Sequence, residues 1–242
     1  MPKMNWIPSL ITSAAIVVAF SALVVIDSGD FALAAKLIMI CLILDGLDGI
    51  TARKLKMSTN FGAELDTFLD QLAYGVVPAF LVYTLLSPYY PALGWALAIV
   101  TVLSGSARLA RFRVVDPARG EKGYLGMPIT VNAGWVAMFV FMTESGFVED
   151  PRFQLTGGFL GWGVWMISLI FLILQVSTVR YRKPTKTPLM FFAGIVAVLL
   201  LFTRVDVAFL SALLLTVYGV YYALISPWMP GQRSKVAAKR QA

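Results

Sequence analysis

The fold of this chain is decided by the stretch Asp45-Gly-Leu-Asp48-Gly49-Ile-Thr-Ala52-Arg53 and, eight residues later, Gly62-Ala-Glu64-Leu-Asp66-Thr-Phe-Leu-Asp70. The stretch holds five of the thirteen acidic residues, and long apolar segments flank it on both sides. A charged side chain at the centre of a membrane helix costs about 2.5 to 3.5 kcal/mol, so carboxylates there normally face a protein interior or a water-filled cavity. The stretch therefore predicts a polar site enclosed between two membrane helices.

The rest of the chain is as apolar as these flanks. Of its 242 residues, 59% are hydrophobic and 14% are charged, and the mean hydropathy is +0.78. A soluble domain has roughly half apolar and a quarter charged residues. A bilayer core about 30 Å thick needs about 20 apolar residues per helix. Eight segments meet this length, some only when polar residues are allowed at one end: Ile7–Ile26, Phe31–Leu55, Gly62–Leu86, Pro91–Arg111, Met127–Phe147, Phe153–Val179, Thr187–Thr203 and Val207–Pro227. We therefore predict an all-α, polytopic integral membrane protein with about eight transmembrane helices, forming one domain over residues 1–242.

The charged loops predict the orientation of this domain. When the loops alternate between the two sides, nearly all basic residues fall on one face: Lys3, Arg53, Lys54, Lys56, Arg113, Arg119, Lys122, Arg180, Arg182, Lys183, Lys186 and the tail residues Arg233, Lys235, Lys239 and Arg240. Cytoplasmic loops carry an excess of Lys and Arg. We expect both termini and the acidic site on the cytoplasmic side of the cell membrane, and a basic cytoplasmic tail at 232–242 that contacts anionic lipid headgroups.

The composition also limits the chemistry. The chain has no histidine, which removes the commonest general base, and its one cysteine, Cys41, has no partner for a disulfide or a zinc-thiolate site. The formal net charge of +7 resides mainly in loops between apolar runs, where bilayer topology explains it better than nucleic-acid binding. Acid-base or metal chemistry in this chain must therefore use carboxylates.

The spacing of the aspartates predicts how they are presented. Asp45 and Asp48 are separated by three residues and Asp66 and Asp70 by four, so on helices each pair lies on one face. Two such faces that meet across a short hairpin offer only oxygen ligands, which suit Mg²⁺ or Mn²⁺. The structural alternative is a hairpin whose glycines permit close packing and whose carboxylates only pair with nearby basic residues.

Taken together, the stretch reads D-x-x-D-G-x-x-A-R-(eight residues)-G-x-x-x-D-x-x-x-D and resembles the signature of the CDP-alcohol phosphotransferase family. The resemblance implies a six-helix membrane core, here with two further C-terminal helices, that transfers a phosphatidyl group from a CDP-linked lipid to an alcohol and releases CMP. It implies one or two divalent ions, Mg²⁺ or Mn²⁺, held by Asp45, Asp48, Asp66 and Asp70. Catalysis would fall to Asp70, the candidate base, together with Asp66. The cytidine nucleotide would be bound by Asp45, Asp48, Gly49, Ala52, Arg53 and Gly62.

A second region of interest follows the fourth segment. Arg108 and Arg111 are separated by three residues and would share a helix face near the cytoplasmic surface. There they are candidates to bind a lipid phosphate or the carboxylate of an acceptor, although basic residues at this place also serve as topology anchors. The segment Gly126-Met-Pro128-Ile-Thr130-Val-Asn132 is the second candidate for acceptor binding, and its structural alternative is a helix start with local hydrogen bonds.

Read jointly, A-R-L-A-R-F and G-M-P-I-T-x-N-A resemble the subgroup of this family that uses serine as acceptor. The corresponding segment of that subgroup is usually close to G-L-P-x-P-A-A-A, from which Met127, Thr130 and Asn132 differ. The implied reaction converts CDP-diacylglycerol and L-serine to phosphatidylserine and CMP, and the implied assembly is a homodimer. A phosphatidylglycerophosphate synthase is the nearest enzymatic alternative. An ion-coupled transporter and a non-catalytic scaffold are alternatives from other classes. The lack of inverted-repeat symmetry and the confinement of the carboxylates to one hairpin disfavour the transporter, and a scaffold would leave the buried carboxylates without a purpose.

Overall fold

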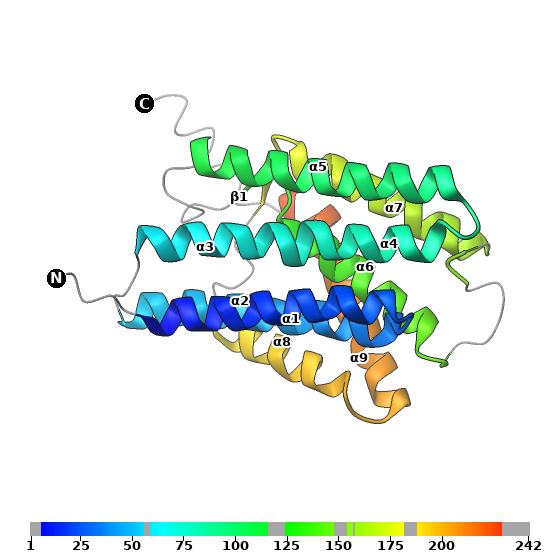
Figure 1. Ribbon diagram of the computed structural model, residues 1–242, viewed down its shortest axis with the longest axis horizontal. Helices are drawn as coiled ribbons and strands as arrows, with labels where there is room; N and C mark the ends of the chain where they lie inside the picture. Colours follow the sequence, from blue (N-terminus) through cyan, green and yellow to red (C-terminus); the bar gives the residue numbers. More distant parts are fainter. Residues whose placement is uncertain are drawn as a thin grey trace.

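The computed structural model describes residues 6–55, 59–115, 124–147, 154–156, 158–181 and 188–228. Helices run through nearly all of this part of the chain: α1 (Trp6–Asp27), α2 (Phe31–Leu55), α3 (Asn60–Asp70), α4 (Val77–Leu86), α5 (Pro91–Val115), α6 (Ile129–Glu144), α7 (Phe159–Val176), α8 (Pro188–Leu200) and α9 (Val205–Val220). Figure 1 shows α1, α2, the rod formed by α3 and α4, and α5 lying roughly parallel, with α6 and α7 behind them. The helices α8 and α9 pack against α2 and α6 respectively.

Within the described residues, four helical stretches are long and apolar enough to cross a membrane: Trp6–Asp27, Asn60–Leu86, Pro91–Val114 and Val205–Ile225. The helix α2 has 25 residues, as expected, but Lys36, Asp45 and Asp48 interrupt its apolar run. The helices α6, α7 and α8 are shorter apolar elements of 16, 18 and 13 residues. The prediction of an all-α integral membrane protein is confirmed. The number of eight transmembrane helices stays a prediction.

The third expected segment is one rod with a change of winding in the middle. Between α3 and α4 the chain forms a π-helical turn, η1 (Gln71–Val76), immediately after Asp70. Pro78 lies in the first turn of α4, and its missing N–H removes the bond that would otherwise reach the carbonyl of Tyr74. The wider π turn accommodates this lost bond, and such turns are frequent at functional sites.

A two-stranded ribbon, absent from the all-α expectation, joins the loop before α6 to the loop after α7. Its strands are β1 (Tyr124–Leu125) and β2 (Arg180–Tyr181), which pair antiparallel with Tyr124 opposite Tyr181. Two further bonds extend the contact, because Gly126 N donates to Val179 O (2.7 Å) and Met127 N to Leu174 O (3.0 Å). The ribbon therefore fixes the entry of α6 against the end of α7.

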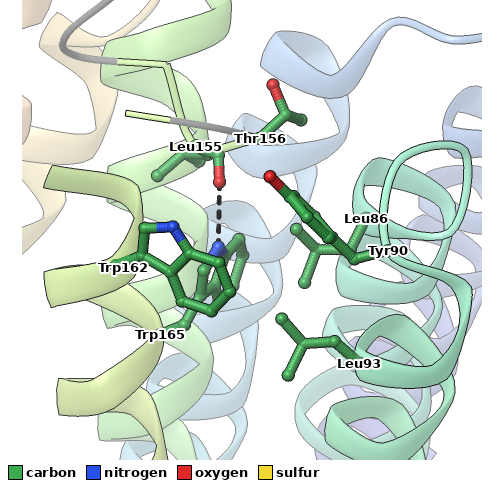
Figure 2. A pocket seen from close by; sticks show the side chains of 7 residues that line it. All are labelled: Leu86, Tyr90, Leu93, Leu155, Thr156, Trp162 and Trp165. Carbon is green, nitrogen blue, oxygen red and sulfur yellow. Dashed lines mark hydrogen bonds between the residues drawn. The ribbon is translucent and has the colours of Figure 1, made fainter. Parts of the chain in front are cut away.

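The end of the molecule far from the aspartates is closed by aromatic packing. Figure 2 shows Trp162 and Trp165 of α7 beside Tyr90, with the Trp165 indole donating to the carbonyl oxygen of Leu155 (2.9 Å). The ring centroids of Tyr90 and Trp162 are 5.6 Å apart. The whole of α4 separates this cluster from Asp70, so it is structural and takes no part in the acidic site.

Several predicted features lie outside the described residues. They are the basic tail at 232–242 and the loop residues Lys3, Lys56, Arg119, Lys122, Arg182, Lys183 and Lys186. The single-domain organisation and the cytoplasmic placement of both termini therefore stay predictions.

Candidate active site

Three of the four predicted metal ligands meet between α2 and α3. Carboxylate oxygens of Asp45, Asp48 and Asp66 all lie within 4.8 Å of one another. Two ligands on opposite sides of an octahedral Mg²⁺ are about 4.2 Å apart, since each bond is about 2.1 Å. Within the described ranges, no lysine or arginine forms an ion pair with Asp45 or Asp48. The donor set and its spacing therefore fit a hard divalent cation, and the alternative that the carboxylates merely pair with basic residues is not supported for Asp45 and Asp48.

Asp70 lies outside this trio, at the end of α3 and next to the π turn. It interacts electrostatically with Asp66 and with the guanidinium of Arg108 on α5. Asp70 therefore lies close to both an acidic residue of the trio and the buried cation of Arg108.

The helix α1 contributes a residue that the sequence analysis did not identify. The hydroxyl of Thr12 donates to Oδ2 of Asp48 at 2.5 Å and lies 3.0 Å from the carbonyl oxygen of Pro8. Both Thr12 (3% exposed) and Asp48 (5% exposed) are buried. The hydroxyl therefore fixes one oxygen of the Asp48 carboxylate. The only signal in the sequence was a polar residue inside an apolar span.

The predicted nucleotide-binding residues surround this trio. The helix α3 begins at its N-cap, Thr59, whose side-chain oxygen accepts a bond from Gly62 N (3.0 Å). A Cβ on Gly62 would lie 3.1 Å from that oxygen and 3.6 Å from the Ser9 hydroxyl of α1. The guanidinium of Arg53 folds back over Gly49, with Nη1 3.3 Å from the position of a Cβ there. Ala52 lies one turn beyond Asp48 on α2 and is half-buried.

An ion pair that the sequence analysis also missed joins α3 and α5. The guanidinium of Arg113, near the end of α5, pairs with the carboxylate of Glu64 in α3. The Glu64 side chain is 53% exposed and that of Arg113 is 22% exposed. Surface pairs of this kind contribute up to about 1 kcal/mol, so this pair helps to fix α3 against α5 without dominating their packing.

Arg108 and Arg111, predicted together as anion-binding residues, have different surroundings. Arg108 is 6% exposed, and its guanidinium carbon lies 5.8 Å from the ring centroids of both Phe112 and Tyr124. Burial raises the pKa of Tyr124 to about 12, although the Arg108 cation acts in the opposite direction. The phenol of Tyr124 is therefore neutral at physiological pH.

The guanidinium of Arg111 is occupied by the backbone. It donates to the carbonyl oxygens of Val176 (2.7 Å), Gln175 (3.0 Å) and Leu125 (3.1 Å). Two of these carbonyls belong to the last turn of α7, where carbonyls have no partner within the helix. The contacts favour a structural role in which Arg111 joins α5, β1 and α7; its predicted contact with a lipid phosphate or serine stays untested.

The predicted acceptor segment forms the entry to α6. Gly126 has φ +79° and precedes Pro128, the N-cap of α6, while Thr130 is half-buried in the first turn. Asn132 is 1% exposed, and its Oδ1 has no hydrogen-bond partner. The structure thus brings Asn132 into the interior beside the other candidate residues, and Gly126 instead serves the backbone turn.

The model of the CDP-alcohol phosphatidyltransferase family matches residues 5–174, so this chain belongs to that family. Curated relatives share about 30% identity with it. The CDP-diacylglycerol–serine O-phosphatidyltransferase of Helicobacter pylori is 30% identical over 221 residues, covering 88% of this chain and 89% of the relative. The protein of the same name from Methanocaldococcus jannaschii is 30% identical over 187 residues, covering 77% and 80%. The archaetidylserine synthase of Methanothermobacter thermautotrophicus is 29% identical over 165 residues, covering 67% and 63%. The family predicted from the motif is confirmed.

Proposed function

We propose that this protein transfers the phosphatidyl group of CDP-diacylglycerol to the hydroxyl of L-serine, giving phosphatidylserine and CMP. The observation that carries the proposal is the carboxylate trio of Asp45, Asp48 and Asp66 within the family motif. The names of the relatives support a CDP-lipid donor and serine as acceptor. A lipid substrate and a motif at the end of membrane helices are consistent with a site at the membrane surface. The distribution of basic residues among the loops supports the cytoplasmic surface.

In this proposal the residues of α2 and α3 hold the donor. Asp45, Asp48 and Asp66 bind one or two ions of Mg²⁺ or Mn²⁺, with Asp70 adjoining them; such ions neutralise charge on the entering and leaving oxygens of a phosphoryl transfer. Gly49, Ala52, Arg53 and Gly62, together with Asp45 and Asp48, contact the cytidine nucleotide. The small residues permit close approach of a flat base, and Arg53 supplies a positive charge beside the phosphates.

The transfer itself forms one bond and breaks one. The serine oxygen attacks the phosphorus that carries the diacylglycerol, the bond from that phosphorus to the CMP oxygen breaks, and the hydroxyl proton passes to a carboxylate. Asp70 is the proposed acceptor of that proton, because it lies beside the trio and faces the cation of Arg108. Arg108 is proposed to bind the acceptor, and the homodimer is proposed from the family.

The first experiment identifies the acceptor. Purified protein in detergent receives CDP-diacylglycerol and Mn²⁺ with L-serine, glycerol 3-phosphate, inositol phosphate or no acceptor, and CMP release is measured. Release that depends on serine supports the proposal. Release that depends on glycerol 3-phosphate instead would assign the phosphatidylglycerophosphate reaction and leave the metal site intact.

Two further measurements separate the roles of the aspartates. Chelation of divalent metal should abolish CMP release, and added Mg²⁺ or Mn²⁺ should restore it; full activity in a chelated, metal-stripped sample would refute the metal site. Asp70→Asn should abolish transfer while CDP-diacylglycerol still binds in the presence of metal. Retained turnover in Asp70→Asn would remove Asp70 as the base.

A further inference from the structure

Three amide side chains near Asp70 each have one polar atom without a partner. The atoms are Oε1 of Gln71, Oδ1 of Asn132 and Nε2 of Gln175. Asn132 and Gln175 are both 1% exposed. A buried donor or acceptor left unpaired costs about 1 to 3 kcal/mol, so each one in a folded protein requires an explanation such as a ligand or a bound water.

All three amides converge on one stretch of α5. The Ser104 hydroxyl donates to Oε1 of Gln175 at 3.0 Å, which leaves the amide nitrogen of Gln175 as the unpaired group. A Cβ on the next residue, Gly105, would lie 3.8 Å from Oε1 of Gln71 and would also contact Ile129 of α6. Asn132 follows Ile129 by three residues and therefore shares its helix face. The side chains of Gln71 and Gln175 thus approach neighbouring residues of α5, and Asn132 lies on the face of α6 whose Ile129 contacts the same stretch of α5.

Two opposite charges lie close to this stretch of α5. Arg108 follows Ser104 by one turn of α5 and is 6% exposed, and Asp70, which precedes Gln71, interacts with it electrostatically. The surroundings therefore offer a carboxylate and two unpaired acceptor oxygens, which suit a cationic group. They also offer a guanidinium and one unpaired amide donor, which suit an anionic group.

We infer that these residues bind the ammonium and carboxylate groups of an amino-acid acceptor. Gln71 and Asn132 accept bonds from the ammonium, and Gln175 and Arg108 donate bonds to the carboxylate. The inference rests on the proposed function and specifies which residues read the acceptor. It also favours a zwitterion over glycerol 3-phosphate, because a dianion leaves two acceptor oxygens unpaired and faces the charge of Asp70.

The test uses acceptor analogues that each lack one charged group, measured as inhibitors of serine-dependent CMP release. Ethanolamine lacks the carboxylate and 3-hydroxypropanoate lacks the ammonium. Gln175→Glu is nearly isosteric and places a negative charge where the carboxylate binds. It should raise the KM for serine about tenfold to a hundredfold and weaken inhibition by 3-hydroxypropanoate, but leave inhibition by ethanolamine unchanged or stronger.

Gln71→Leu should reverse the effects on the two inhibitors. It removes an acceptor for the ammonium, so the KM for serine rises by a similar factor and ethanolamine inhibits less, while inhibition by 3-hydroxypropanoate is retained. The control is Gln154→Leu, because Gln154 is exposed in the segment before α7 and lies far from Asp70. Binding of CDP-diacylglycerol with Mn²⁺ should be unchanged in all three variants, which reports that they are folded.

The outcomes separate the inference from the proposed function. If the unaltered protein releases no CMP with serine but does so with another alcohol, the proposed function fails. If serine remains the acceptor but the KM for serine is unchanged in both variants, the amides are structural and the inference is wrong. Parallel weakening of both analogues in either variant would show general distortion and would also overturn it.

Discussion

The substitution Gly126→Ala tests whether the junction of β1, α5 and α7 is as closely packed as the structure shows. Gly126 has φ +79°, and a Cβ there would collide with the carbonyl oxygen of Gln175 and the guanidinium of Arg111, with the carbonyl oxygen of Ser177 at 3.1 Å. The first two atoms form a hydrogen bond with each other. A methyl group at this position must therefore displace either the last turn of α7 or the Arg111 side chain.

The loss of stability in Gly126→Ala can be estimated by comparison with a second glycine, which has the same backbone conformation but open space around it. Gly146 has φ +73°, and a Cβ there meets no heavy atom within 4 Å. Gly146→Ala should cost only the left-handed conformation, about 1 to 2 kcal/mol. Gly126→Ala adds the cost of overpacking, typically about 1 to 3 kcal/mol, which corresponds to a further fall in melting temperature of roughly 2 to 12 °C.

The chain contains its own reporter for this measurement. Cys41 is the only cysteine and is fully buried, so a thiol-reactive fluorogenic dye reacts with it only on unfolding. Melting curves of the detergent-solubilised variants would be recorded under one set of conditions, because unfolding of membrane proteins on heating is often irreversible. A fall for Gly126→Ala equal to or smaller than that for Gly146→Ala would refute the close approach of Arg111 and Gln175 to this turn.

Two other predictions concern residues around the site. Thr12→Val removes the hydroxyl that holds Asp48, so the affinity for Mn²⁺, measured by electron paramagnetic resonance, should fall about 10- to 100-fold. The control Thr84→Val loses a hydroxyl that bonds only within α4 and should leave this affinity unchanged. Equal affinities in the two variants would remove Thr12 from the site. Arg113→Ala breaks the pair with Glu64 and should lower the stability by no more than about 1 kcal/mol, a few degrees in melting temperature. A much larger fall would show that the pair stabilises the protein more than the exposure of its side chains predicts.

The positions of the helices could be predicted closely because the bilayer sets their length and the apolar runs are long. The prediction Phe31–Leu55 matches α2 at both ends, and Gly62–Leu86 matches the rod from Asn60 to Leu86 to within two residues. Helix ends within the loops were less accurate: of the segment expected at Phe153–Val179, the described part is helical over Phe159–Val176, whereas residues 154–156 and 177–179 are not helical. The π turn after Asp70 was not predicted, since hydropathy does not distinguish windings of a helix.

The carboxylate trio could be predicted for a different reason than its surroundings. Asp45, Asp48 and Asp66 belong to one hairpin, so local spacing alone brings them together. Thr12 contacts Asp48 from a helix that is distant in sequence, and Gln175, which we infer to contact the acceptor, lies on another. In lipid, helix faces that contact lipid and faces that contact other helices are similarly apolar, and one sequence does not reveal which helices become neighbours. For Arg111, the helix face was inferred correctly but its backbone partners were not, because they lie 14 and about 65 residues away.

A C-terminal helix outside the region matched by the family contacts the helix that carries the first two motif aspartates. The family match ends at residue 174, yet α8 packs against α2, the helix that carries the first two motif aspartates. The ring of Phe191 occupies the space where a Cβ of Gly46 would project, with its Cζ 2.9 Å from that position. Gly46 lies between Asp45 and Asp48, and its small size is what allows α8 to approach there. The rotation of α2, and with it the direction of both carboxylates, therefore depends on a helix that the motif itself does not include.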